Sequence, residues 1–240
     1  MCGPGDTGNL GIAKSSAGEE IPMEKPRLVI FDIDGTLLPG TSCERLFFKY
    51  LVKKKFLGFG NFLKFAMRGL TLATKGMAYI ISANKGYLSG FEMEFIEKIG
   101  AAFFNSEVEK RIPRKAIIAV TEHKMRGHKV ILLSGMPEFL LKNFSELLKV
   151  PEFYGSVMEI KNGKYTGKTI GVFPIVKGKP EIVEMILKKH NVEWNQVTAY
   201  ADHFHDRFLL QKVGEPVAVN PDEKLKALAE TNNWRIEYFT

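Results

Sequence analysis

The sequence has few cysteines and no long apolar run. Cys2 and Cys43 are the only cysteines in 240 residues, and Cys2 lies in a glycine-rich stretch, so we expect no disulfide framework and a reducing, cytoplasmic setting. No run reaches eighteen uncharged apolar residues, which argues against a membrane-spanning helix. Residues 1–24 lack the apolar centre of a secretory signal and show no hydrophobic periodicity. We expect a disordered tail there.

Acidic residues are scarce between Thr41 and Gly86. Glu44 stands there against nine lysines and arginines, a local charge of +8, while the whole chain carries +7. Phenylalanines interleave with these lysines. One interpretation is a helical segment that buries its aromatics and lets long lysine stems cover its rim. The other is an amphipathic surface for peripheral contact with an anionic membrane or a phospholipid substrate. Nucleic acid is not an expected partner, because no reader motif accompanies the charge.

Short apolar runs that end in turn-forming or polar residues predict an alternating α/β chain. The expected strands are 27–32, 128–134, 196–202 and 215–220, and the expected helices are 113–126, 137–148, 180–190, 205–212 and 222–231. Strands alternating with helices predict a doubly wound, mostly parallel sheet. Ligands bind such a sheet at the carboxyl ends of its strands.

Two segments interrupt this alternation. Residues 46–109 are mostly helical, so we predict an inserted helical cap there and an α/β core formed by 25–45 and 110–240. An Asn-Gly pair between β-prone runs predicts a hairpin within 153–169.

Two carboxylates, Asp32 and Asp34, follow the first predicted strand and precede Gly35. A turn there lets both face one ligand, so Asp32 can attack phosphorus while Asp34 protonates the leaving alkoxide. The two charges repel each other unless a cation lies between them, and oxygen ligands beside a phosphate favour Mg²⁺. The pair therefore predicts magnesium-dependent hydrolysis of a phosphate monoester.

Further polar residues stand where later strands end and helices begin. Ser134 and Gly135 offer a hydroxyl and a backbone N–H to phosphoryl oxygens, beside a helix N-terminus. Lys179 offers a balancing positive charge, and Asp202 and Asp206 offer oxygen ligands for the metal ion. Because carboxyl ends of parallel strands meet at one edge, we expect these side chains to converge with the aspartate pair.

These residues, in this order, resemble the four motifs of the haloacid dehalogenase superfamily of phosphohydrolases. The Asp-x-Asp-Gly-Thr signature at residues 32–36 is highly specific for it, and the likeness spans about 25–238. The resemblance implies a Rossmann-like core with an inserted helical cap. It implies an aspartyl-phosphate intermediate on Asp32, with Asp34 as the acid/base.

The resemblance also assigns the remaining roles. Asp32, Asp34 through its backbone carbonyl, and Asp202 are implied metal ligands, with Asp206 supporting them. Lys179 rather than Lys177 matches the family lysine, because the residues after it open the next helix in register. The helical insertion and the closing stretch 214–222 resemble the subgroup of phosphoserine phosphatases and phospholipid-related phosphatases.

Two departures narrow the expected substrate. Thr41 stands where phosphoserine phosphatases carry an acid that holds the substrate ammonium, and Glu44 is out of register. We therefore favour an amphiphilic or lipid-linked phosphate over phosphoserine. The fourth motif carries bulky residues between Asp202 and Asp206, where the family has small ones. Its histidines, His203 and His205, are expected to point apart.

Three alternatives stay open at this point. The first is a phosphoserine phosphatase-like enzyme acting on a small metabolite. The second is a non-catalytic protein that binds phosphate or membranes, which the bulky fourth motif favours and the intact aspartates oppose. Carbon–halogen hydrolysis on the same scaffold is disfavoured, since it needs no second carboxylate to protonate a leaving alkoxide.

Overall fold

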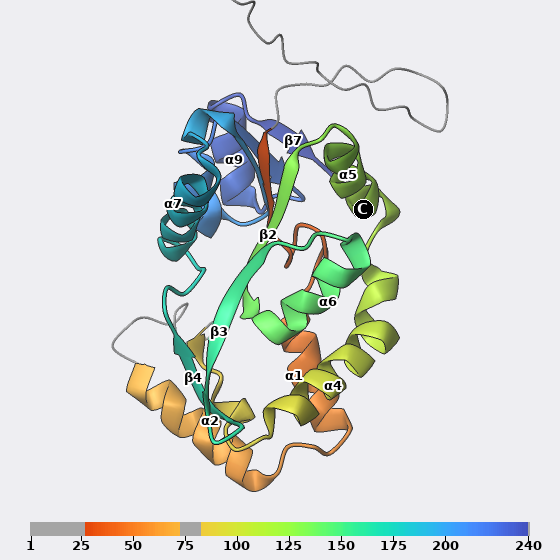
Figure 1. Ribbon diagram of the computed structural model, residues 1–240, viewed down its shortest axis with the longest axis vertical. Coiled ribbons are helices and arrows are strands. Elements are labelled where there is room, and N and C mark those ends of the chain that lie inside the picture. The colour runs from red at the N-terminus through yellow and green to blue at the C-terminus, as the bar shows by residue number, and fades with distance from the viewer. Residues whose placement is uncertain (1–26, 73–82, 240) are drawn as a thin grey trace, which may run out of the picture.

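The computed structural model describes residues 27–72 and 83–239, so the expected tail lies outside the described part (Figure 1). Within those ranges the strands form one sheet in the order β4-β3-β2-β1-β5-β6-β7. The strands are β1 Leu28–Phe31, β2 Lys129–Pro137, β3 Phe153–Lys161, β4 Lys164–Ile170, β5 Val197–Ala201, β6 Glu215–Val219 and β7 Arg235–Glu237. Every neighbouring pair is parallel except β3 and β4. The predicted doubly wound, mostly parallel α/β class is confirmed.

Helices cover both faces of this sheet. Successive residues of a strand point to opposite faces, so Val29 and Phe31 enter one hydrophobic core while Leu28 and Ile30 enter the other. The first core is shared with α1 Cys43–Lys53, α4 Met93–Phe103, α5 Arg114–Met125 and α6 Glu138–Leu148, and the second with α7 Gly178–His190, α8 Arg207–Leu210 and α9 Glu223–Thr231. Burial on both faces explains why β1 is apolar throughout.

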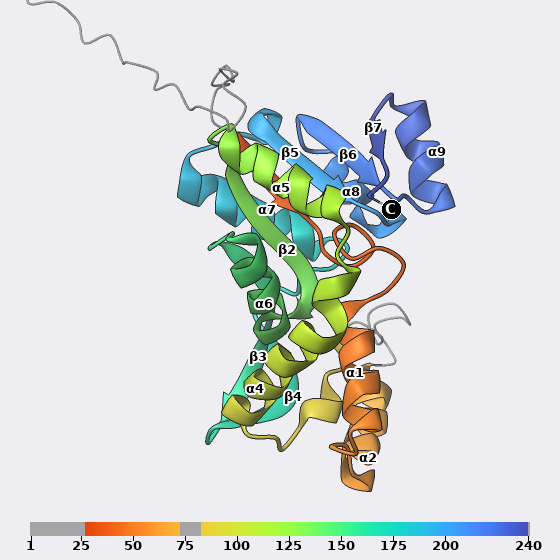
Figure 2. The same cartoon turned by 90° about the vertical axis from the view of Figure 1, so that its right-hand side faces the viewer.

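A helical insertion occupies the chain between β1 and β2. It contains α1, α2 Phe59–Leu72, a 3-10 turn at Gly86–Leu88, and α4. Figure 1 and Figure 2 show these helices at the end of the molecule where the β3–β4 hairpin also lies. The backbone N–H of Tyr165 on β4 donates to the Phe91 carbonyl (2.9 Å), and Met93 N–H donates to the Gly163 carbonyl (2.9 Å). The hairpin is therefore attached to the insertion by main-chain bonds.

The structure differs from the sequence expectations in three places. The hairpin forms as predicted, but β3 also extends the main sheet, pairing in parallel with β2 at Leu132 and Leu133. Strand β2 continues past Ser134 to Pro137, with a register shift between Leu133 and Pro137. A short last strand, β7, adds a parallel neighbour to β6 that the sequence pattern did not indicate. No helix among the described residues is long and apolar enough to cross a membrane.

Candidate active site

The site lies where the strand order reverses on either side of β1. Asp32 directly follows β1, and its backbone N–H donates to the Tyr200 carbonyl of β5 at 3.0 Å. β2 flanks β1 on one side and β5 on the other, which brings Ser134 and Asp202 to the same edge of the sheet. Such a switch point opens a crevice at the carboxyl ends of the strands. The predicted convergence of these residues is observed.

Lys179 joins two of the predicted aspartates. Its ammonium Nζ lies 2.8 Å from Asp32 Oδ1 and 2.8 Å from Asp206 Oδ1, and all three side chains are buried. It stands in the first turn of α7, whereas Lys177 is exposed at the residue before that helix. Of the two candidate lysines, the structure therefore brings Lys179 to the aspartates.

Asp202 is held beside the loop that follows β1. Its Oδ1 lies 3.4 Å from the Thr36 hydroxyl, and its backbone carbonyl accepts a bond from Asp222 N–H at 2.9 Å. Gly35 adopts a positive φ of +85°, and a Cβ built there would lie 1.8 Å from Asp202 Oδ2. Only glycine accommodates both this backbone conformation and the approach of the carboxylate.

Several carboxyl groups are crowded into this small buried volume. Burial, together with the charges of Asp32 and Asp206, raises the pKa of Asp202 to about 8. Burial likewise raises the pKa of Asp32 to about 7, although the Lys179 ammonium opposes the rise. For Lys179 itself, burial lowers the pKa, but the two carboxylates outweigh it and hold the pKa above its usual value. One ammonium thus lies among three acidic side chains, and the pKa values of Asp32 and Asp202 are raised despite it.

The donor set fits a hard divalent cation. One carboxylate oxygen from each of Asp32, Asp202 and Asp206 lies within 4.8 Å of the others. Carboxylate oxygens suit Mg²⁺, and a divalent charge would relieve the crowding that raises these pKa values. Asp34 is expected to bind through its backbone carbonyl rather than its carboxylate, and its role as a ligand stays a prediction.

Asp34 is oriented by the start of the insertion. Its Oδ1 accepts the backbone N–H of Cys43 at 2.8 Å, and the Ser42 side chain also bonds to it. Burial raises the pKa of Asp34 to about 6, against the lowering effect of the Cys43 and Ser42 bonds. A pKa near the working pH suits a group that must both give and accept a proton. Cys43 is itself a buried free cysteine.

Ser134 and Gly135 lie in the part of β2 that lines the pocket. The buried Ser134 oxygen accepts the backbone N–H of Met136 at 3.3 Å, and the Gly135 carbonyl accepts the Ser156 hydroxyl at 2.6 Å. Both residues line the same pocket as the aspartates, about 600 Å³ in volume. The six predicted carboxylate, serine and lysine positions therefore line one cavity: Asp32, Asp34, Ser134, Lys179, Asp202 and Asp206.

The insertion supplies the far wall of that pocket. Glu44 receives a hydrogen bond from the Tyr87 hydroxyl at 3.0 Å and an ion pair from Lys85, a lysine that is 0% exposed. Arg45, which has no acidic partner among the described residues, lines the wall beside it. Apolar side chains complete the lining: Phe48, Phe65, Met136, Pro174, Ile175 and Val176. The Glu44 charge is thus already neutralised by protein groups.

The histidines of the fourth motif were expected to point apart, and this is wrong. His203 and His205 have ring centroids 4.3 Å apart, and both line the pocket. The 3-10 turn at Phe204–Asp206 brings them together, because the His205 backbone N–H donates to His203 Nδ1 at 3.1 Å. Phe204 turns away into the second hydrophobic core, which accommodates the bulk of the motif.

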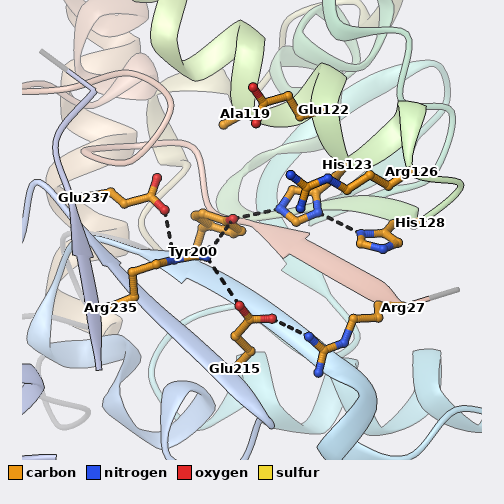
Figure 3. Close-up of a pocket in the computed structure, with 10 residues that line it drawn as sticks. All are labelled: Arg27, Ala119, Glu122, His123, Arg126, His128, Tyr200, Glu215, Arg235 and Glu237. Atoms are coloured by element: carbon orange, nitrogen blue, oxygen red, sulfur yellow. Dashed lines mark hydrogen bonds and ion pairs between the residues drawn. The ribbon is translucent and has the colours of Figure 1, made fainter. Parts of the chain in front are cut away.

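A second cavity of about 320 Å³ lies at the amino ends of the strands, away from the aspartates (Figure 3). Tyr200 is at its centre, with its hydroxyl 2.7 Å from His123 Nε2 and 2.7 Å from Arg235 Nη2. Glu215 pairs with both Arg27 and Arg235. Figure 3 shows these groups bonded to one another across the cavity, so we interpret it as a polar network that supports the sheet.

Several residues in or around the active pocket are not indicated by the sequence pattern. Lys85 and Tyr87 follow Glu44 by about forty positions, and no spacing rule connects them. The sequence pattern places Asn220 at a strand end, and the structure shows that its side-chain amide donates to the Gly35 carbonyl at 3.0 Å, which supports the aspartate loop. The positive φ of 44° at Asn220 is a conformation that asparagine tolerates, and the Asn-Pro pair was the available signal.

Comparisons with known proteins agree with this geometry. The family model for haloacid dehalogenase-like hydrolases matches residues 29–211. Phosphoserine phosphatase SerB1 of Mycobacterium tuberculosis is 24% identical, over 95% of this chain and 76% of its own length. The histidinol-phosphatase of Neisseria meningitidis is 27% identical, over 88% of this chain and 98% of its own.

A solved structure shows the same fold. A protein of unknown function from Bordetella pertussis superposes with a TM-score of 0.79 at 20% identity, covering 90% of this chain and 100% of that one. The family match spans the aspartate loop, the serine strand, the lysine helix and the acidic turn described above. The chain therefore belongs to the haloacid dehalogenase-like hydrolase family, and it is a phosphatase.

Proposed function

We propose that this phosphatase hydrolyses phosphate monoesters in two in-line displacements through a phosphorylated Asp32. The observation that carries the proposal is the buried contact of Lys179 with Asp32 and Asp206, beside Asp202. Lys179 fixes one Asp32 oxygen at 2.8 Å, which leaves the other oxygen for attack on phosphorus. Ser134 and Gly135 border the space that the phosphoryl group would occupy.

The first displacement forms a bond between Asp32 and phosphorus and breaks the bond between phosphorus and the ester oxygen. Asp34, partly protonated at neutral pH by its raised pKa of about 6, gives its proton to the leaving alkoxide. In the second displacement Asp34 takes a proton from water, whose oxygen attacks phosphorus and releases inorganic phosphate from Asp32. Mg²⁺ held by Asp32, Asp202 and Asp206 would offset the negative charge that gathers on these groups. Lys179 contributes to the same charge balance throughout.

We propose in addition that the substrate is an amphiphilic or lipid-linked phosphate. Glu44 is already bonded by Lys85 and Tyr87, so it offers little to the ammonium of an amino-acid ester. The leaving-group side is mostly apolar and carries Arg45 at its edge. The inserted segment 46–109 would act as a cap that limits water during transfer. A small phosphorylated metabolite is the second candidate, favoured by the phosphoserine and histidinol phosphatase relatives.

The test is phosphate release by the purified chain with Mg²⁺, first from p-nitrophenyl phosphate and then from a panel. The panel contains phosphoserine, histidinol phosphate and lysophosphatidic acid. We expect turnover that chelation abolishes and that Asp32→Asn lowers below detection. Turnover in Asp32→Asn equal to wild type would contradict the nucleophile, and a preference for phosphoserine would contradict the substrate class.

A further inference from the structure

Helix α2 has its apolar face turned outward. Its inner face, at positions 61, 65, 68 and 72, packs toward the rest of the insertion, and two of those residues are the polar Asn61 and Arg68. Its outer face carries five large apolar side chains, which we name the outer stripe: Phe59, Phe62, Leu63, Met67 and Leu70. A water-exposed helix ordinarily has the opposite arrangement. Figure 1 shows α2 along an outer edge of the molecule.

The five side chains of the outer stripe are exposed to solvent and lie on one side of the helix. Phe59 is 84% exposed and Leu70 is 78% exposed, while the other three lie between 42% and 58%. Spacings of three and four residues place all five on one side of the helix, over a length of about 16 Å. An exposed apolar patch of this kind marks a contact site. The inner face is fixed meanwhile, because Asn61 Nδ2 donates to the Tyr87 carbonyl at 3.2 Å and Phe65 lies against Phe48.

The segment that carries the outer stripe has charge of one sign. From Arg45 to Phe91 the sequence contains nine lysines and arginines and no aspartate or glutamate. Lys53 ends α1, and Lys54 and Lys55 follow it before α2 begins. All three are exposed and have no acidic partner among the described residues. Lys64 lies on α2 itself and reaches the Ser89 carbonyl at 3.3 Å. An apolar line bordered by lysines matches the acyl boundary and negative headgroups of an anionic bilayer.

We propose that the outer stripe of α2 and the lysines Lys53–Lys55 form a docking surface for anionic lipid bilayers. The straight line of protruding side chains suits a fluid surface, which needs no matching pockets. Phe65 on the inner face of the same helix lines the active pocket, so docking would bring that pocket close to the lipid headgroups. The inference rests on the proposed function for its link to lipid-linked substrates, but the surface is tested separately.

The experiment is co-sedimentation of the full chain with phosphatidylcholine vesicles, with and without phosphatidylserine. We expect binding to the mixed vesicles that weakens as salt is added. Phe59→Ser with Leu70→Ser should lower the affinity by tenfold or more, on the order of the transfer cost of such side chains. The triple change of Lys53, Lys54 and Lys55 to Gln should lower it by about the same factor.

Matched variants separate this surface from general stickiness. Met185→Ser removes an apolar side chain of α7 that is 56% exposed, close to the 58% of Met67 in the outer stripe. Changing Lys142, Lys188 and Lys224 to Gln removes three exposed lysines elsewhere. We expect both to bind vesicles as wild type does. Because the mutated side chains project into solvent, folding and p-nitrophenyl phosphate hydrolysis should be unchanged in all four variants.

Two outcomes overturn the proposal. One is that the wild-type protein stays in the supernatant with phosphatidylserine vesicles. If the stripe variants then convert a dimer into monomers, the stripe is an interface between two copies of the chain instead. The other is undiminished binding by Phe59→Ser/Leu70→Ser. Vesicle binding without phosphatase activity would refute the proposed function and leave the surface standing. Phosphatase activity without vesicle binding would do the reverse.

Discussion

Gly35→Ala tests whether the position of Asp202 controls activity. The new Cβ would lie 1.8 Å from Asp202 Oδ2, and real Cβ atoms essentially never come within 3.0 Å of another group, so the carboxylate must retreat by about 1.2 Å. The positive φ of +85° adds backbone strain of about 1–2 kcal/mol. A displacement of about 1 Å at a reacting site costs on the order of a hundredfold in rate. We therefore expect kcat to fall about a hundredfold. We also expect the Mg²⁺ concentration needed for half-maximal activity to rise.

Gly40→Ala is the matched control. Gly40 belongs to the same loop and has a positive φ of +70°, but a Cβ there would meet nothing within 4 Å. Backbone strain should lower the free energy of unfolding of both variants by about 1–2 kcal/mol in urea unfolding. Gly40→Ala should keep its activity. The assay is p-nitrophenyl phosphate hydrolysis across a Mg²⁺ titration. Equal activity of the two variants, or an unchanged Mg²⁺ dependence in Gly35→Ala, would refute the argument.

Two further predictions concern buried charges. Lys179→Met removes the ammonium that contacts Asp32 and Asp206, so the pKa of Asp32 should rise above its value of about 7. Stability should fall by about 3 kcal/mol at pH 8, where the mutation leaves buried negative charge without its partner, and by less at pH 5, where Asp32 takes up a proton. Equal losses by thermal unfolding at both pH values would count against this account. Burial, followed by the nearby His128, lowers the pKa of His123 from 6.5 to about 4, so wild type should lose stability as pH falls from 6.5 towards 4. In His123→Gln the free energy of unfolding should fall by about 1 kcal/mol less over this pH range, a figure that allows for the partial exposure of His123. If urea unfolding gave the same dependence on pH for the variant and wild type, this account would be wrong.

The residues at the carboxyl ends of the strands were predictable because strands and their ends leave a local pattern in the sequence. Each apolar run ended in the residue that the site uses, so parallel pairing alone placed Asp32, Ser134 and Asp202 together. The lysine was predictable for a similar reason, since Lys179 stands in the first turn of a helix that packs beside these strands. The predicted elements that met these local rules are present at nearly the expected bounds.

The remainder depended on contacts between distant residues. The ion pair of Lys85 with Glu44 spans 41 positions and leaves no periodic trace in the sequence. The second role of β3, as a parallel neighbour of β2, follows from where α6 returns the chain rather than from the hairpin motif. The contact between His203 and His205 depends on the 3-10 turn, which the spacing of two residues did not specify.

The β3–β4 hairpin has a consequence for substrate entry. The insertion is joined covalently to the α/β layer at its two ends, and the main-chain bonds of Phe91 and Met93 to β4 make a third attachment. A body held at three points cannot swing about one hinge, so wide opening would first have to break those bonds or carry β3 away from β2. Entry to the aspartates should therefore depend on small movements of side chains at the pocket rim, such as Arg45 and His205. The strand that carries Ser134 would be disturbed by any larger motion, which links access to the site with the geometry of phosphate binding.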